Sequence, residues 1–171
     1  MMKFFDVGFT GTSTGMTNAQ TLEIHMLLGD LQTYIRSQRA HHGLCVGSDA
    51  QFHQMAKAMG YLVIGHPGVN REGQPAKRAT DLVCDSTHPE LFYLERNVNI
   101  VIESAVLLAT PRTMVEEIRS GTWQTIRSAR RQKRPRIIVY PDGTSAAEGF
   151  NLLHVRSATD LRMELAQLRC G

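Results

Sequence analysis

Residues 4–35, FFDVGFTGTSTGMTNAQTLEIHMLLGDLQTYI, contain the signals of one complete strand–turn–helix unit. The apolar run Phe4–Phe9 predicts a strand, and the segment Thr10–Gly15 after it is rich in glycine and hydroxyl side chains. Thr17 followed three residues later by Gln20 is a capping box, the pattern of a helix start. Apolar residues then recur at helical spacing and predict a helix to about residue 38: Ile24, Leu27, Leu28, Leu31 and Ile35.

The same alternation of strands and helices continues along the chain. Short apolar runs predict further strands at Gly43–Val46, Tyr61–Ile64, Ala105–Ala109 and Ile137–Tyr140, with a weaker one at Leu152–Val155. Helices are predicted to begin at Asp49, Pro89 and Ser120, and a last helix carries Leu161, Leu165 and Leu168. This alternation predicts an α/β fold, Rossmann-like and doubly wound, with a mainly parallel sheet of five to six strands and helices on both faces.

The chain shows no repeat, low-complexity tract or domain boundary, so residues 1–171 are expected to form a single nucleotide-binding Rossmann-like domain. Its longest loop, His66–Thr87, is polar, and loops of that length are usually functional or mobile. The formal net charge of +3 favours anionic ligands but is small for a nucleic-acid binder.

The cysteines and the hydropathy of the sequence indicate the cellular compartment in which the protein is expected. The three cysteines, Cys45, Cys84 and Cys170, are widely spaced without a C-x-x-C, which argues against a disulfide framework and for a reducing compartment. No apolar run approaches the roughly 20 residues that cross a bilayer, and the N-terminus does not match a signal peptide. We therefore expect a cytoplasmic protein with no membrane partner.

Two turns are candidate phosphate sites. Ligands of doubly wound sheets lie beyond the carboxyl ends of the strands, where the strand order reverses, and in the common order strands one and four flank that point. The loops after them, Thr10–Met16 and Thr110–Gly121, both lead to helix N-termini, which favour anions. The candidate ligands are Gly11, Thr12 and Ser13 in the first loop and Ser120, Gly121 and Thr122 in the second. For each loop, a plain turn or an N-cap remains the alternative.

Other candidates come from two further helices. Gly47 precedes a helix on which Asp49 and His53, four residues apart, share a face, where they could contact a ligand, pair with each other or simply cap the helix. Arg96, followed by Asn97, could clamp a phosphate or carboxylate, or belong to a solvated helix face.

Metal binding has no support from local spacing. The seven histidines form no H-E-x-x-H, and no Cys–His spacing matches a zinc site, so neither a metal nor a cofactor is expected. The pair His41-His42 is interpreted as structural and as preceding a strand, and Trp123 as a core residue of its helix.

These motifs, in this order, resemble a known superfamily. Gly47-Ser48-Asp49 with His53, then Arg96-Asn97, then Ser120-Gly121-Thr122 with Thr125 resemble the Rossmann-like domain of the DNA-processing protein A (Smf) family and the Lonely Guy phosphoribohydrolases, which together form the SLOG superfamily. The resemblance covers about residues 4 to 143. It implies a homodimer or higher homo-oligomer, for which the Met-rich helix segment Phe52–Met59 could offer a surface.

The two branches imply different chemistry. Leu94-Glu95-Arg96 resembles the Lonely Guy motif that holds a catalytic arginine, but Thr125 stands where that family has its catalytic glutamate, and Glu116 or Glu117 could substitute. The DNA-processing branch is similar at Asp49, His53, Arg96, Asn97 and Thr125, and there the domain binds single-stranded DNA and helps to load a recombinase. A freestanding domain of this superfamily is typically a nucleotide sensor, sponge or processing module.

Three functions remain open at this point. The favoured one is binding of a nucleotide or nucleotide-derived ligand at the carboxyl edge of the sheet, with phosphate on the two glycine-containing turns, charge from Arg96, and Asp49 and His53 at the ribose or base. The second is a nucleoside 5′-monophosphate N-glycosidase that uses Arg96 with Glu116 or Glu117. The third is a single-stranded DNA-binding recombination accessory protein. Whether the chain is an enzyme stays undecided.

Overall fold

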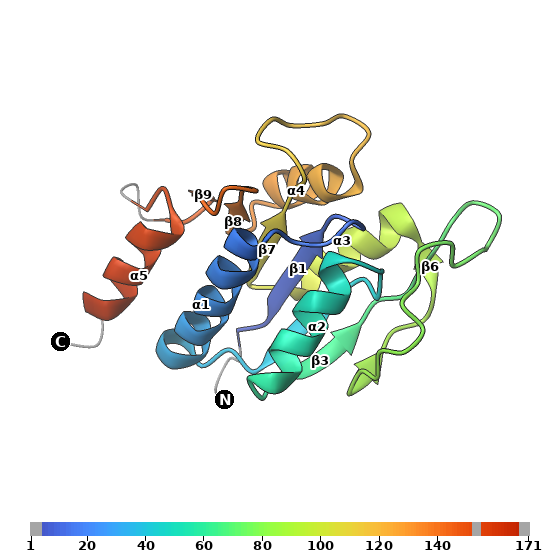
Figure 1. Ribbon diagram of the computed structural model, residues 1–171, viewed down its shortest axis with the longest axis horizontal. Helices are drawn as coiled ribbons and strands as arrows, with labels where there is room; N and C mark the ends of the chain where they lie inside the picture. The colour runs from blue at the N-terminus through green and yellow to red at the C-terminus, as the bar shows by residue number, and fades with distance from the viewer. Residues whose placement is uncertain (1–4, 152–154, 168–171) are drawn as a thin grey trace.

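The computed structural model describes residues 5–151 and 155–167, and its centre is a seven-stranded sheet (Figure 1). The strands are β1 (Val7–Gly11), β2 (Arg39–His42), β3 (Leu62–Gly65), β5 (Ser86–Thr87), β7 (Val106–Thr110), β8 (Arg136–Val139) and β9 (Ser145–Glu148). Their order is β5-β3-β2-β1-β7-β8-β9, and all neighbours are parallel except β8 and β9. Two short strands, β4 (Gly68–Val69) and β6 (Leu91–Phe92), pair separately.

Helices cover both faces of this sheet: α1 (Asn18–Ile35), α2 (Ser48–Ala58), α3 (Tyr93–Glu103), α4 (Gly121–Arg131) and α5 (Ala158–Gln167). On one face Phe9 of β1 belongs to the same buried cluster as Leu28 of α1 and Phe52 of α2. On the other face Leu107 of β7 packs with Ile100 of α3 and Ala129 of α4. The predicted doubly wound, Rossmann-like α/β fold is therefore confirmed, with seven strands in place of five to six.

Two helix starts follow the chemistry that their sequences indicate. The Thr17 hydroxyl accepts a hydrogen bond from Gln20 N at 3.1 Å while Thr17 N donates to Gln20 Oε1 at 3.0 Å, which completes the capping box of α1. Ser120 Oγ caps α4 by accepting from Trp123 N at 3.3 Å, and Trp123 is buried as predicted. Asp49 was expected to cap α2, but the N-cap is Gly47 and Asp49 lies in the first turn.

The second strand lies earlier than predicted. The expected strand Gly43–Val46 belongs to the connection between β2 and α2, and β2 is formed by the residues before it. In this connection Leu44 has a φ of 53°, Gly47 a φ of 81°, and Cys45 makes an isolated antiparallel bridge with Arg78. His41 and His42, expected to precede the strand, are buried inside it. A polar pair of this kind does not show the apolar pattern of a buried strand, because its burial depends on hydrogen-bond partners from elsewhere in the chain.

Other boundaries shift by smaller amounts. The helix predicted from Pro89 begins at Tyr93 and extends to Glu103, because β6 occupies the residues before it. The loop after β3 contains β4 and β5 and is less irregular than expected. Of the weak strand predicted at Leu152–Val155, residues 152–154 lie outside the described part, as do Phe4 and Leu168; the last described strand is β9.

The strand order reverses beside β1. β2, β3 and β5 follow on one side of it and β7, β8 and β9 on the other, and the register pairs Gly11 at the end of β1 with Thr110 at the end of β7. The loops after these two strands therefore start side by side, as the topology rule predicts.

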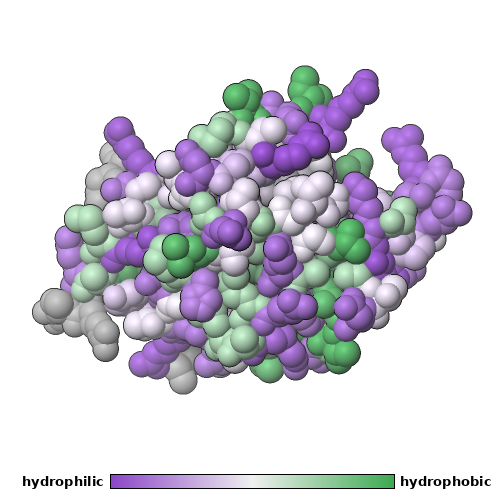
Figure 2. All heavy atoms as spheres, viewed as in Figure 1, coloured by the Kyte–Doolittle hydropathy of each residue, from purple (hydrophilic) through white to green (hydrophobic). Residues whose placement is uncertain are grey.

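The surface mixes polar and apolar side chains on the face shown in Figure 2. Hydrophobic residues stand out over the loop before α4, whose exposed apolar side chains are Met114, Val115 and Ile118. In the Met-rich segment of α2, Phe52 is buried and Met55 and Met59 are half-buried against the core, and the expected dimer surface stays a prediction. In the described residues no helix is long and apolar enough to cross a membrane.

Candidate functional site

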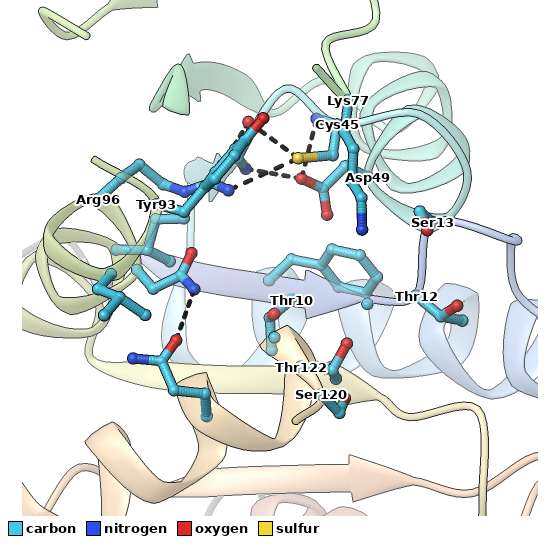
Figure 3. Close-up of a pocket in the computed structure, with 18 of the residues that line it drawn as sticks. Thr10, Thr12, Ser13, Cys45, Asp49, Lys77, Tyr93, Arg96, Ser120 and Thr122 are labelled. Carbon is cyan, nitrogen blue, oxygen red and sulfur yellow. Dashed lines mark hydrogen bonds between the residues drawn. The ribbon is translucent and has the colours of Figure 1, made fainter. Parts of the chain in front are cut away.

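A pocket of about 500 Å³ lies at the carboxyl edge of the sheet, where the strand order reverses (Figure 3). The loop after β1, the start of α4, the loop after β2 and α3 all contribute to its lining. The predicted site residues that line it are Gly11, Thr12, Ser13, Asp49, Arg96, Asn97, Glu117, Ser120, Gly121 and Thr122. The structure thus brings together residues that are spread over about two thirds of the sequence.

The start of α4 forms one wall. The first N–H groups of a helix have no partner within it, and they carry the positive end of the helix dipole. Ser120 and Thr122 point their hydroxyls towards the pocket in Figure 3. A Cβ added at Gly121 would meet nothing within 4 Å, so the space in front of this helix start is open. An anion can therefore approach the backbone here.

The loop after β1 forms the opposite wall. Thr12 and Ser13 present hydroxyls, and Thr12 Oγ1 and Thr14 Oγ1 lie 2.8 Å apart, within hydrogen-bond distance. The Thr12 carbonyl accepts from Ser48 N at 3.0 Å, which ties this loop to the start of α2. Gly47 does not line the pocket. It allows the loop after β1 to pack against the start of α2, because its φ of 81° suits glycine and a side chain there would collide with the Ser13 carbonyl.

Asp49 and Arg96 form a buried wall around the turn after β2. Asp49 Oδ2 accepts from Gly43 N at 2.9 Å and from Cys45 N at 3.2 Å. Arg96 donates from Nη1 to the carbonyls of Gly43 and, at 3.0 Å, of His66. Its guanidinium lies where a side chain at Gly43 would be, which explains the glycine. Arg96 is therefore a buried brace of the turn, not the solvated helix residue that the sequence also allowed.

Burial changes the chemistry of this wall. Desolvation raises the pKa of Asp49 to about 6, although the nearby Arg96 charge and the two backbone donors act in the opposite direction. Burial likewise raises the pKa of the Cys45 thiol, and Arg96 Nη2 lies 3.6 Å from its sulfur. The pocket thus holds a carboxyl group that binds a proton more readily than an exposed aspartate does.

Aromatic and polar side chains of α3 complete the lining. The Tyr93 ring lies beside the Arg96 guanidinium, with 5.5 Å between the guanidinium carbon and the ring centroid. Asn97 Nδ2 donates to Gln124 Oε1 at 3.0 Å and links α3 to α4. Among the described residues, the buried Tyr93 hydroxyl and Arg96 Nε have no hydrogen-bond partner.

Basic residues outnumber acidic ones around the pocket. Lys77, Arg96, Arg112 and Arg119 line it, against the carboxyl groups of Asp49 and Glu117. Glu117 is paired with Arg112 at 3.0 Å. The balance favours an anionic ligand.

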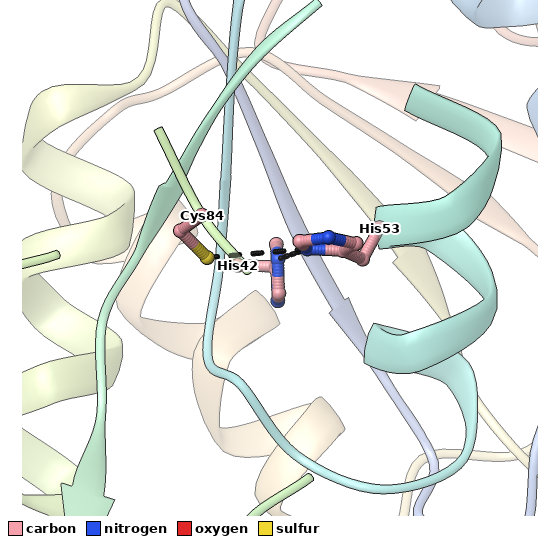
Figure 4. A group of neighbouring side chains, drawn as sticks. All are labelled: His42, His53 and Cys84. Atoms are coloured by element: carbon pink, nitrogen blue, oxygen red, sulfur yellow. Dashed lines mark hydrogen bonds between the residues drawn. The ribbon is translucent and has the colours of Figure 1, made fainter. Parts of the chain in front are cut away.

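Besides Gly47, the candidates His53 and Glu116 lie away from the pocket lining, as does Thr125. His53 faces the sheet, where its Nδ1 lies 3.0 Å from His42 Nε2 (Figure 4), so it neither pairs with Asp49 nor reaches the pocket. Glu116 is held by Arg127 at 3.0 Å and Arg130 at 2.8 Å, which lower its pKa. Thr125, at the position of the Lonely Guy glutamate, is buried and donates to the Gly121 carbonyl at 2.9 Å.

Sequence reasoning missed several lining residues, notably Gly43, Cys45, Lys77, Tyr93 and Gln124. Gly43 and Cys45 follow directly from the misplaced second strand, because a strand that ends at residue 42 puts them at the carboxyl edge. Lys77 belongs to the long loop that the sequence singled out without naming a residue. Tyr93 had no signal of its own, since it lies in a segment predicted as helix interior.

Comparison of the chain with sequence profiles of known families and with curated proteins gives no match. Solved structures do match. The molybdenum cofactor binding protein from the phototrophic bacterium Rippkaea orientalis is 20% identical, with a TM-score of 0.59 over 98% of this chain and 87% of that one. The molybdenum cofactor carrier protein of Chlamydomonas reinhardtii is 17% identical, with a TM-score of 0.55 over 80% and 76%.

DNA processing protein A of Streptococcus pneumoniae is also similar, at 18% identity and a TM-score of 0.57, over 98% of this chain but only 57% of that one. At these identities the likeness shows the fold. This chain has the Rossmann-like fold of these proteins, and one of them, DNA processing protein A, carries the name of a family that its motifs resemble.

Proposed function

We propose that the chain binds a nucleotide or a nucleotide-derived small molecule in this pocket. The observation that carries the proposal is the meeting of two hydroxyl-bearing loops, one of them an open helix start, in a pocket with more basic than acidic residues. A phosphate fits the start of α4, and Asp49 offers a carboxyl acceptor to the amino or ring N–H groups of a heterocycle. Two proteins of the same fold are named for the molybdenum cofactor, so that cofactor is tested beside the nucleotides.

The experiment is calorimetric titration of the purified chain with nucleoside monophosphates, nucleoside diphosphates, cyclic nucleotides and the molybdenum cofactor. We expect Gly121→Val to weaken binding at least about tenfold, because its side chain fills the space of the phosphate. A Cβ at this position meets no neighbour within 4 Å in the ligand-free protein, so we expect the fold to be retained. Lys77→Ala, which removes an exposed cation from the lining, should weaken binding by about tenfold or less.

Arg131→Ala is the matched control, because Arg131 is an exposed cation at the opposite end of α4 and lies outside the pocket lining. Binding to Arg131→Ala should equal binding to the wild type. The proposal fails if no phosphorylated ligand binds the wild type, or if Gly121→Val binds as tightly as the wild type at an unchanged melting temperature. Analysis of the titrated mixtures for free base identifies cleavage, for which Glu117 is the pocket's candidate acid or base.

A further inference from the structure

A second group of side chains lies on the α3 face of the sheet, away from the pocket lining. It consists of His41 in β2, His66 just after β3 and Glu103 at the end of α3. One ligand atom from each, His41 Nδ1, His66 Nε2 and Glu103 Oε2, lies within 4.8 Å of the other two. The three residues come from separate parts of the chain, so no local spacing in the sequence predicted that they lie together.

The distances suit a small cation. His41 Nδ1 is 2.9 Å from His66 Nε2 and 3.6 Å from Glu103 Oε2, and the remaining pair is 3.9 Å apart. The centre of this triangle is about 2.0 Å from each corner, which is the length of zinc–nitrogen and zinc–oxygen bonds. Ligand atoms around a tetrahedral ion with bonds of this length lie about 3.3 Å apart, so shifts of roughly half an ångström bring all three atoms to one metal ion.

The hydrogen bond between His41 and Asp6 sets which ring nitrogen of His41 has a free lone pair. His41 Nε2 lies 3.1 Å from Asp6 Oδ2, and Asp6 is itself held by Arg39 at 2.8 Å. A carboxylate accepts and does not donate, so the His41 proton lies on Nε2 and Nδ1 keeps its lone pair towards His66 and Glu103. A carboxylate behind a ligating histidine is the usual outer arrangement of protein metal sites.

The other two ligands also have the required form. The His66 ring is buried beside the rings of His41 and His88, and burial favours the neutral imidazole that binds a metal. Glu103 supplies a negative charge, and His88 Nε2 lies 2.9 Å from its Oε2. His41 and His66 are buried, whereas Glu103 and His88 are about one third exposed, so a cation can enter on their side.

We propose that His41 Nδ1, His66 Nε2 and Glu103 Oε2 bind one divalent transition-metal ion of the zinc class, with a fourth position open to water beside His88. Two imidazoles and one carboxylate are the donor set that zinc accepts in three-ligand sites. In the metal-free chain His66 donates to His41 Nδ1; when the ion binds, the His66 proton moves to its other ring nitrogen. The site is independent of the proposed phosphate pocket and is tested separately.

The test is calorimetric titration of the untagged, chelator-treated chain with Zn²⁺, repeated with Co²⁺ to record its visible absorption. We expect one ion per chain and a Co²⁺ spectrum of four-coordinate type. Glu103→Gln removes a ligand from a partly exposed position and should weaken binding at least about tenfold. Asp6→Asn leaves all three ligands in place and should weaken binding by about 10- to 100-fold.

His25→Ala controls for casual binding by an exposed histidine, and its Zn²⁺ affinity should equal that of the wild type. Circular dichroism of each variant establishes that it is folded, and a variant that does not fold is replaced by Glu103→Ala, which alters only the partly exposed ligand. The proposal is overturned if the wild type binds no stoichiometric ion, or if the folded Glu103 variant binds Zn²⁺ as tightly as the wild type.

Discussion

His41 and His42 are neighbours in β2, so their rings lie on opposite faces of the sheet and contact different residues. Each ring meets two other metal-binding groups: His41 meets His66 and Glu103, and His42 meets His53 and Cys84 (Figure 4). The two groups offer the same number of ligand atoms at similar spacing. Counting ligand atoms alone would therefore rank the two clusters equally.

The outer hydrogen bonds separate them. Asp6 accepts a hydrogen bond from His41 Nε2–H, which leaves the lone pair of His41 Nδ1 towards the cluster. On His42 the outer partner is a donor, because Leu44 N–H reaches its Nδ1 at 3.1 Å. A neutral His42 must then keep its proton on Nε2, the atom that lies 3.0 Å from His53 Nδ1. A hydrogen bond joins two rings in both clusters, but in the His41 cluster its proton belongs to His66, which can carry it on its other ring nitrogen. In the His42 cluster the Leu44 N–H holds that proton on His42 Nε2, so a cation could bind there only if the Leu44 hydrogen bond were broken.

The largest effect that would test this comparison is on stability. His42 is completely enclosed, and its truncation leaves a cavity and an unpaired Leu44 N–H, so His42→Ala should lower the free energy of unfolding by about 2–4 kcal/mol. His41→Ala should lower it by about 1–2 kcal/mol, because water can enter beside the partly exposed Glu103. Urea unfolding in the presence of a chelator measures both, and equal losses would contradict the assignment of His42 as the purely structural residue.

The same pair shows what the sequence could and could not predict. The first strand, its turn and α1 follow from local period and a capping box, and the meeting of the loops after β1 and β7 follows from a topology rule. β2 was misplaced because its two histidines are stabilised in the interior by residues such as Asp6 and His66, which are remote in sequence.

The candidate site divides in the same way. Ser120 and Gly121 were found because a capped helix start is visible locally. The structural role of Arg96, which braces the turn at Gly43, depends on a contact across 53 residues that no spacing rule contains. Turns were predictable where their hydrogen bonds are local, as at Ser120, and were missed where the hydrogen bonds join distant segments, as at Gly43.

An intermediate effect is expected on acid stability. Burial lowers the pKa of His41, His42, His53 and His66 below the ordinary value of 6.5. Below that pH the unfolded chain binds protons that these buried rings do not take up in the folded chain, so the free energy of unfolding should fall as the pH drops from about 7 to 5. Asp49 opposes this, because its pKa is raised to about 6 and the folded chain takes up that proton more readily.

His42→Gln tests how much the His42 ring contributes to the pH dependence of the free energy of unfolding. The amide oxygen can still accept from Leu44 N–H, but the side chain no longer titrates. Burial lowers the pKa of His42 most, and the rings of His53, His66 and His41 and the Arg96 charge act in the same direction. Urea unfolding of metal-free protein between about pH 7 and 5 should therefore give a shallower loss for His42→Gln than for the wild type. Stability that rises towards pH 5, or an unchanged slope in the variant, would contradict this account.

The smallest expected effect falls on Cys84, the third member of the His42 cluster. Its sulfur is 3.9 Å from His53 Nδ1, an atom already in contact with His42 Nε2, and burial raises the pKa of the thiol. Cys84→Ser keeps a weak donor at that distance and should change the free energy of unfolding by less than about 1 kcal/mol. Its Zn²⁺ affinity should equal that of the wild type, whereas Glu103→Gln on the other side of β2 loses about tenfold or more. If Cys84→Ser instead lost Zn²⁺ affinity while Glu103→Gln kept it, the ion would bind in the cluster where the outer hydrogen bond is donated, and the proton assignment that separates His41 from His42 would be wrong.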